Sequence, residues 1–156
     1  MKFVGAINSI VGGLMAIIGL SVTCFIGSIL GSSVNYTGWE LIGDDLSLNG
    51  FVMFRLFAII GLIFGIIAIL YGLFLLLVDL KVIKIKAKSN LNLINNVLLS
   101  IFVLCTLLAF IGVGVMAGDA TTSVIKAHIG VGAYLMFIIP AVLCLCNWLF
   151  ARKASK

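Results

Sequence analysis

The sequence predicts an all-α integral membrane protein, a bundle of four transmembrane helices. Of its 156 residues, 63% are hydrophobic and only 10% are charged, a composition far more apolar than that of soluble domains. Four stretches remain mostly apolar over about 20 residues or more, the length needed to cross about 30 Å of hydrocarbon. The positive charges gather on one side of these stretches, which is typical of a membrane protein with a defined topology.

The four predicted spans form a single membrane domain over residues 1–156, and the segments between them are too short for a second domain. The first span is longer than the apolar core of a secretory signal peptide, which has about 7 to 15 residues, so we interpret it as a transmembrane helix. The spans run over about Val4 to Leu30, Leu56 to Val78, Val97 to Ala117 and Val124 to Phe150.

The cations predict the orientation, because Lys and Arg residues near span ends stay in the cytoplasm. Only Arg55 and Lys126 fall on the opposite side, so both termini and an inner loop at residues 79–96 are expected to be cytoplasmic. The lysines of this loop are expected to contact anionic lipid headgroups rather than nucleic acid. They are Lys81, Lys84, Lys86 and Lys88. The eight cytoplasmic cations are Lys2, Lys81, Lys84, Lys86, Lys88, Arg152, Lys153 and Lys156.

The outer loop at residues 31–50 has glycines at its ends and β-forming residues between them, which predicts a small β-hairpin or an irregular cap. Its Asn35, followed by Tyr and Thr, matches the acceptor sequence for N-glycosylation. Near the outer ends of the spans, Arg55 is expected to pair with Asp119. The alternatives are a pair with Asp44 or Asp45, or an Arg55 side chain that reaches water.

Small residues recur at heptad spacing in the first two spans. Helices in lipid associate by close backbone approach, which small side chains permit, so each series predicts a helix-packing seam. One interpretation is that the first two spans pack on each other; the other is that the seams receive a second copy or a partner subunit. The seam residues are Gly5, Ser9, Gly12, Ala16, Gly19 and Thr23, then Ala58, Gly61, Gly65, Ala68 and Gly72.

In layout, with four spans, cytoplasmic termini and a longer first outer loop that contains a Trp, the chain resembles the claudin-like and MARVEL-type tetraspan families. The loop pattern of claudin-like proteins, a Trp, a Gly-Leu-Trp and two cysteines, has no counterpart here, since Trp39 is followed by Glu40 and Leu41 and the loop has no Cys. The resemblance is therefore one of topology, and it implies no site residues.

The sequence offers little for catalysis. No acidic residue lies in the middle of a predicted span, and the single His128 is too far in sequence from a second His or a Cys pair to suggest a metal site. Cys144 and Cys146 form C-x-C rather than a redox C-x-x-C. We therefore expect no enzyme activity, cofactor, metal or small-molecule substrate. The expected surroundings are the lipid bilayer and either other membrane subunits or further copies of the chain.

The predicted function is that of a non-catalytic tetraspan, a structural subunit of a membrane complex or a membrane-organising protein that acts through its seams. The expected location is the plasma membrane or a bacterial inner membrane, with an organelle membrane as the alternative. The alternative function is a small oligomeric channel or transporter component. Its pore would be lined by Ser21, Thr23, Ser28, Ser100, Thr106 or Asn147.

Overall fold

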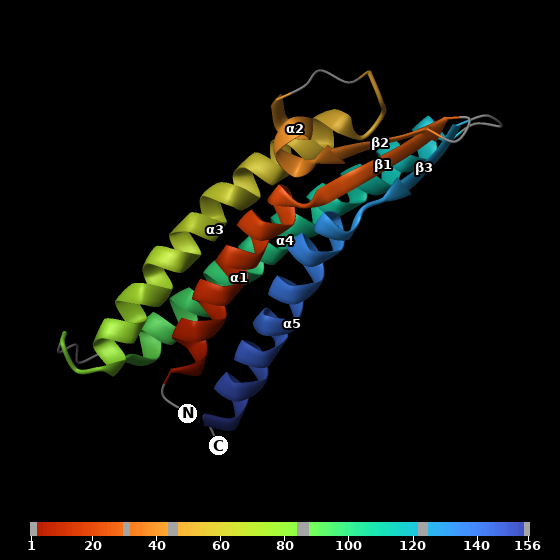
Figure 1. Ribbon diagram of the computed structural model, residues 1–156. Coiled ribbons are helices and arrows are strands. Elements are labelled where there is room, and N and C mark those ends of the chain that lie inside the picture. Colours follow the sequence, from red (N-terminus) through yellow and green to blue (C-terminus); the bar gives the residue numbers. More distant parts are fainter. Residues whose placement is uncertain (1–2, 30–31, 44–46, 84–87, 122–124, 155–156) are drawn as a thin grey trace.

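A computed structural model describes residues 3–29, 32–43, 47–83, 88–121 and 125–154 of the chain. Four long helices form a bundle, and each contains a stretch long and apolar enough to cross a membrane (Figure 1). The prediction of four such helices is confirmed. They are α1 (Val4–Ser21), α3 (Phe51–Asp79), α4 (Lys88–Ala120) and α5 (Val131–Ala154).

The helices form a ring in which α1 packs between α3 and α5, and α4 packs on α3 and α5 from the other side. Both chain termini lie at one end of this bundle, here called the termini end (Figure 1). A small antiparallel sheet lies at the opposite end, here called the sheet end, and the short helix α2 (Gly38–Gly43) follows it. The strand order is β2-β1-β3. The strands are β1 (Thr23–Ile29), β2 (Ser32–Thr37) and β3 (Ile125–Ile129).

Two predicted spans begin or end as strands instead. The first helix stops at Ser21 and does not reach Leu30, and the fourth begins at Val131 rather than at residue 124. The strands β1 and β3 are rich in β-branched residues and are apolar enough to extend a hydropathy window, but they pair with each other. The prediction of an all-α protein is therefore wrong for the segments that form the three-stranded sheet. Thr23 lies in β1 rather than on the α1 seam.

The expected hairpin within residues 31–50 is only partly right. The strand β2 lies in that loop, but its partner is β1, which belongs to the segment predicted as the first span. The second neighbour of β1 is β3, which directly precedes α5. The sheet therefore ties together the α1–α3 and α4–α5 connections at the sheet end, and sequence patterns taken one loop at a time do not reveal such a pairing.

The helix α4 is longer than predicted, since it begins at Lys88 instead of Val97 and shortens the expected inner loop. Its first turns are polar in sequence, yet Asn95 is only 1% exposed because it faces the inside of the bundle. With 33 residues, α4 is about 50 Å long, about 20 Å more than the hydrocarbon core of a bilayer. Strands β1 and β3 pack on its far end.

The helix α3 ends in a Schellman motif. The Val82 N–H donates to the Leu77 carbonyl at 3.0 Å, and the Lys81 N–H donates to the Val78 carbonyl at 3.1 Å. Lys81 takes the left-handed position of this motif, with φ of 62°, where glycine is the usual residue. The chain therefore turns away from the helix directly after Asp79.

Candidate functional site

The small-residue seam of α1 faces α4 and α5. A Cβ atom on Gly5 would lie 3.6 Å from the Asn95 side chain, and one on Gly19 would lie 2.8 Å from the Gly132 backbone. Close packing with α3 uses Gly13, which lies outside the predicted seam: its Cβ would lie 2.5 Å from the Gly65 carbonyl oxygen. Gly19 and the other three helical seam residues, Ser9, Gly12 and Ala16, are buried.

The seam of α3 faces α1 and α4. A Cβ on Gly72 would lie 2.9 Å from the Ala6 carbonyl oxygen of α1, and one on Gly61 would lie 3.7 Å from Thr106 of α4. All five predicted residues, Ala58, Gly61, Gly65, Ala68 and Gly72, are buried. Both seams are thus filled by helices of the same chain, and neither presents an open groove to a partner.

A cluster of buried amides joins α1 to α4 and α5 near the termini end. The Asn8 side-chain amide donates to the Asn147 side-chain carbonyl at 2.7 Å. One residue further along α1, the Ser9 hydroxyl donates to the Asn95 side-chain oxygen at 2.7 Å, and the Asn95 amide donates to the Gly5 carbonyl at 3.2 Å. In an apolar surrounding such bonds fix the register of the helices, because an unpaired amide is costly to bury.

The same region continues to Ser100 on α4. Its hydroxyl donates to the Asn96 carbonyl at 2.8 Å and accepts a bond from the Trp148 indole N–H at 3.1 Å. The Asn147 side-chain nitrogen is buried and finds no hydrogen-bond partner among the residues that the structure describes. Besides these amides, hydroxyls and the indole, the Cys144 thiol lies 3.7 Å from the Ser100 hydroxyl. The hydrogen bonds of the cluster join α1, α4 and α5. Asn8 and Asn95 are not among the predicted site residues, although an Asn within an apolar helix is the signal that marks them.

Of the residues considered for a pore, Ser100 and Asn147 belong to the cluster described above, and the others lie elsewhere. The Ser21 hydroxyl donates to the Ile17 carbonyl and that of Thr106 donates to the Val103 carbonyl, both within their own helices. Ser28 lies on β1 and donates to the Lys126 carbonyl of β3. Side chains that bond back to the backbone are the ordinary state of hydroxyls in apolar helices. These bonds do not join the residues into one path, and a channel function stays a prediction.

The sheet has one apolar and one polar face. Phe25, Ala127 and Ile129 belong to the face that packs on the bundle, and Tyr36 contacts the Phe25 ring at 6.2 Å between centroids. Because side chains alternate along paired strands, the residues between them point to the other face. We call this face the outer platform. It comprises Ile26, Ser28, Ser33, Asn35, Lys126 and His128, of which the last four are exposed.

A reciprocal capping box joins β2 to α2. The Thr37 N–H donates to the Glu40 carboxylate at 2.7 Å, while the Glu40 N–H donates to the Thr37 hydroxyl at 3.3 Å. These bonds, first the one from the Thr37 N–H and then one from its hydroxyl, hold the pKa of the Glu40 carboxyl below its ordinary value. The spacing T-x-x-E is a sequence signal for such a cap, and it went unused in the sequence analysis.

The junction between α1 and the sheet is closely packed. Cys24 is fully buried, and its thiol donates to the Gly19 carbonyl at 3.3 Å. Burial raises the pKa of the Cys24 thiol to about 12, so it stays protonated at neutral pH. The Trp39 indole N–H of α2 donates to the Ser21 hydroxyl at the end of α1, at 3.0 Å. Both contacts tie the same end of the sheet, where Thr23 pairs with Thr37, to the end of α1.

The remaining predicted site residues lie near the two ends of the bundle. At the sheet end, the Asp119 carboxylate accepts two bonds from Asn49, at 3.0 and 2.9 Å, and its pairing with Arg55 stays a prediction. At the termini end, Lys81 is exposed, Lys84 and Lys86 lie outside the described residues, and Lys88 begins α4. The possible partners Asp44 and Asp45 of Arg55 also lie outside the described residues.

Neither a protein-family model nor a curated protein matches this sequence. Within the part of the chain that the structure describes, no group of three or more His, Cys, Asp and Glu side chains could hold a metal ion. The architecture therefore defines the class: a four-helix bundle whose helices can cross a membrane, with a small sheet over one end. Its function is inferred from its surfaces.

Proposed function

We propose that the chain is a non-catalytic tetraspan membrane protein that serves as a structural subunit of a membrane complex or as a membrane organiser. In this proposal α1, α3, α4 and α5 cross the bilayer, with the termini end in the cytoplasm and the outer platform on the opposite side. The expected membrane is the plasma membrane or a bacterial inner membrane.

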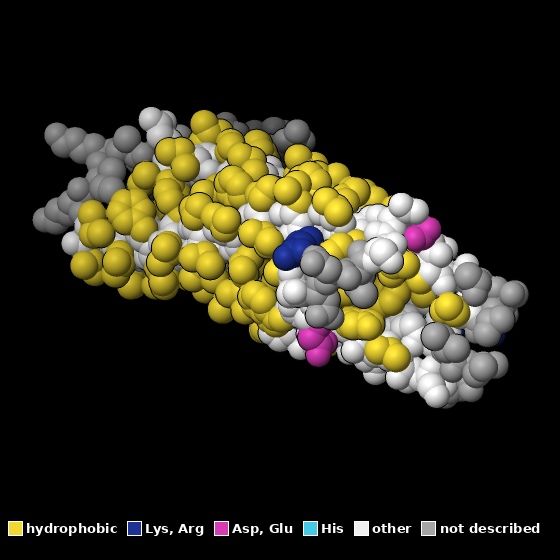
Figure 2. Space-filling view, turned by 90° about the horizontal axis from the view of Figure 1, so that it is seen from above, with side chains coloured by type: hydrophobic (Ala, Val, Ile, Leu, Met, Phe, Trp, Pro, Cys, Tyr) yellow, Lys and Arg dark blue, Asp and Glu magenta, His cyan; other side chains and the backbone are white. Residues whose placement is uncertain are grey.

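The surface of the bundle supports a membrane location. Large hydrophobic side chains are exposed along all four long helices, among them Ile18, Leu70, Leu104 and Leu145. A soluble protein rarely exposes so much contiguous apolar surface. Figure 2 shows hydrophobic side chains over most of the face seen from above, with charged side chains only at separate points. Lipid contact accounts for this surface without any partner.

The positive charges support the orientation. Among the described residues, the termini end has one acidic residue, Asp79, and four cations, whereas the sheet end has two acidic residues and two cations. The cations at the termini end are Lys81, Lys88, Arg152 and Lys153, and the charged residues at the sheet end are Glu40, Asp119, Arg55 and Lys126. The eight cations that the sequence places at the termini end fit retention in the cytoplasm. The extra length of α4 then projects beyond the hydrocarbon and carries the sheet clear of it.

The observation that carries the proposed function is the contrast between the seams and the platform. The seam residues pack against helices of the same chain, so a partner subunit must bind to another surface. The outer platform is mostly polar, four of its six residues are exposed, and the end of the sheet next to α1 is tied to the bundle by the Trp39–Ser21 bond. A fixed polar surface of this kind suits recognition outside the bilayer. The seams thus act in assembly only indirectly, by building the bundle that holds the platform.

The first test is the composition of the particle extracted in digitonin, measured by native mass spectrometry with protein identification. Different co-purifying subunits support a structural subunit, and a homo-oligomer supports a membrane organiser. A monomer that binds no other protein in the source membrane contradicts both. Conductance that appears when the purified chain alone is reconstituted would favour the channel instead.

The second test asks which surface meets the partner. A photo-crosslinking amino acid is placed at Ser33, on the outer platform, and separately at its neighbour Val34, whose side chain belongs to the opposite face. Both positions are exposed, so they differ mainly in direction. Crosslinks to a co-purifying subunit from Ser33 but not from Val34 are expected. Equal crosslinks from both would contradict the assignment of the platform.

A further inference from the structure

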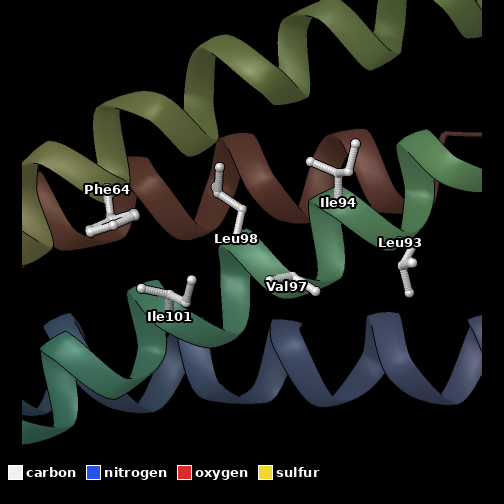
Figure 3. Close-up of a pocket in the computed structure, with 6 residues that line it drawn as sticks. All are labelled: Phe64, Leu93, Ile94, Val97, Leu98 and Ile101. Atoms are coloured by element: carbon white, nitrogen blue, oxygen red, sulfur yellow. The ribbon is translucent and has the colours of Figure 1, made fainter.

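The surface of the described residues includes an apolar groove and a free sheet edge. The groove has about 280 Å³ and lies between α3 and α4, lined by Phe64 of α3 and five aliphatic side chains of α4 (Figure 3). These side chains are all hydrocarbons, so the groove has no polar group that would select one occupant. Unpaired backbone groups at a sheet edge are more selective, because they require an extended strand as their partner.

The edge of the sheet at β3 is closed. The Gly130 N–H donates to the Cys24 carbonyl at 2.8 Å, and this bond fixes which residues of β3 direct their backbone groups toward β1. By the alternation of the ladder, the Ala127 N–H points away from β1, and it donates to the Thr121 hydroxyl at 3.3 Å. Thr121 directly follows α4, so the end of that helix covers the centre of this edge.

The edge at β2 is open. Alternate residues of β1 bond to β3 and to β2, and the same alternation makes Val34 one of the residues of β2 that bond to β1. Its neighbours Ser33 and Asn35 therefore direct their N–H and C=O groups away from the sheet. Thr37 does the same, and its N–H donates to the Glu40 carboxylate at 2.7 Å. The open part of the edge is thus at Ser33 and Asn35, which are both exposed.

This edge lacks the features that protect exposed strands in most proteins. Such strands commonly contain Lys or Pro, which disfavour the addition of another strand. The segment Ser32–Thr37 contains no charged residue and no proline, whereas β3 has Lys126. In addition, Val34 is 50% exposed, because it lies opposite Gly27, which has no side chain to cover it. A strand added to β2 would pair its backbone groups and cover Val34.

A second copy of the same strand is complementary to this edge. In an antiparallel pair centred on Val34, Ser33 of each copy lies opposite Asn35 of the other, and their outward N–H and C=O groups bond. On one face a hydroxyl meets an amide, and on the other face the two Val34 side chains meet. No like charges face each other. A two-fold parallel pair is excluded, because it would place each N–H opposite an N–H.

The direction of the strands determines how the two copies are oriented. Ala127 bonds to Thr121 just beyond the end of α4, whereas the Ile129 side chain lies 3.8 Å from a Cβ placed on Gly114, within α4. The strand β3 therefore runs back along α4, and Figure 1 shows the strands continuing outward from the ends of α1 and α5. Antiparallel pairing of β2 then reverses the helices of the second copy. Two copies with the same topology cannot be reversed within one membrane, but they can face each other from two membranes.

We therefore propose that β2 joins two copies of the chain head to head from facing membranes. The inference rests on the proposed function, in which the sheet end lies outside the cytoplasm, and it specifies how a membrane organiser of this kind would act. It uses the edge of the sheet and leaves the outer platform to a different subunit. A contact through Ser33 and Asn35 is small, so many such contacts between two membranes act together.

The test uses the full chain, made without N-glycosylation so that Asn35 carries no glycan. Two preparations with different affinity tags are reconstituted in separate vesicles, which are then mixed and oxidised. A disulfide-linked dimer that carries both tags can form only between facing membranes. Val34→Cys should form such dimers, because two opposed residues of a non-hydrogen-bonded pair have Cα atoms about 4.5 Å apart, within the range of a disulfide.

The matched control is Ser32→Cys. Ser32 is exposed and lies on the same face of β2, but in the proposed pair it is about 13 Å from its counterpart in the second copy. It should give several-fold fewer dimers with both tags than Val34→Cys. The parent protein gives the background, and its Cys24, Cys105 and Cys144 are buried.

A second pair of variants tests the backbone bonds. Added to Val34→Cys, Ser33→Pro removes an outward N–H and leaves the bonds between β2 and β1 in place, so it should lower the yield of dimers with both tags several-fold. Ser33→Ala keeps this N–H and should leave the yield unchanged. The midpoint of unfolding in detergent shows whether each variant is folded, and the comparison of Val34→Cys with Ser32→Cys does not depend on Ser33→Pro.

Three results would overturn the inference. The first is an equal yield from Val34→Cys and Ser32→Cys, and the second is the absence of dimers that carry both tags. The third is a photo-crosslinking amino acid at Val34 that captures a different subunit, and no second copy, in the source membrane.

Failure of this inference is separable from failure of the proposed function. If accessibility labelling places the sheet end in the cytoplasm, the proposed topology fails whatever the vesicles show. If the labelling agrees with the topology and no dimers form between vesicles, the strand pairing alone fails.

Discussion

Gly13 of α1 and Gly65 of α3 bring two helices into backbone contact, since a Cβ on Gly13 would lie 2.5 Å from the Gly65 carbonyl oxygen. No side chain can be inserted there unless the helices move apart. Gly13→Ala should therefore destabilise the bundle by about 1 to 3 kcal/mol and lower the thermal midpoint in detergent. Gly65→Leu should lower the folded yield further, because Phe102 and Gly13 occupy the space around it.

The matched control is Gly118→Ala, at the far end of α4, where a Cβ would meet no atom within 4 Å. This change should leave the midpoint unchanged or raise it slightly, because Ala favours the helix by about 1 kcal/mol over Gly. Equal stability of Gly13→Ala and the parent protein would show that α1 and α3 are not in backbone contact.

The Asn8–Asn147 bond should be measurable as a coupling between α1 and α5. Asn8→Leu and Asn147→Leu should each destabilise, and the double variant should lose less than the sum. Hydrogen bonds between membrane helices contribute about 0.6 kcal/mol on average and about 1.7 at most, so a coupling of about 1 kcal/mol is expected. Unfolding of all four proteins in one detergent gives this value, and additive effects would contradict the bond.

Lys81 should be replaceable by glycine with a gain in stability. Its φ of 62° is unfavourable for a residue with a Cβ and ordinary for glycine. Lys81→Gly should stabilise the protein by about 1 kcal/mol, as read from the midpoint of unfolding in detergent. Lys81→Ala, which also removes the charge but keeps the Cβ, should give no such gain. A similar gain from both variants would assign the effect to charge instead.

The capping box of Thr37 and Glu40 should make α2 sensitive to acid. The pKa of the Glu40 carboxyl is lower in the folded protein than in the unfolded chain. The ionised carboxylate therefore stabilises the fold fully at pH values above the ordinary pKa of Glu. The effect is lost as the pH falls through the lowered pKa. Hydrogen exchange of residues 38–43 should accelerate on acidification beyond the intrinsic pH effect. Glu40→Gln should remove this dependence, and an unchanged profile in that variant would contradict the cap.

The four apolar helices could be predicted from the sequence because hydropathy and helix length are local properties. The ends of the first and fourth spans could not, because Thr23–Ile29 and Ile125–Ile129 are apolar enough to extend a span. Only pairing between segments about 100 residues apart shows that they are strands. A window over one segment contains no information on such a partner.

The packing sites were also only partly predictable, because residue spacing is a local property and helix contacts are not. Heptad spacing identified Gly65 and Gly72 as packing residues and offered the first span as one possible partner, and both glycines do approach α1. Gly13 was missed because it lies one residue off the series. Asn95 was assigned to a loop on its polarity, whereas its hydrogen bonds to Ser9 and Gly5 allow it to be buried. Whether a polar side chain can be buried depends on its hydrogen-bond partner, and the sequence alone does not show that partner.

The most direct test of the four-span account is the side of the membrane on which the two ends of the bundle lie. Single cysteines are introduced at Ser47, near the sheet end, and at Ser89, in the first turn of α4, and are labelled in intact cells with a membrane-impermeant maleimide. The account predicts labelling of the Ser47 variant from outside, and of the Ser89 variant only after the membrane is opened. Labelling of both from the same side would contradict it.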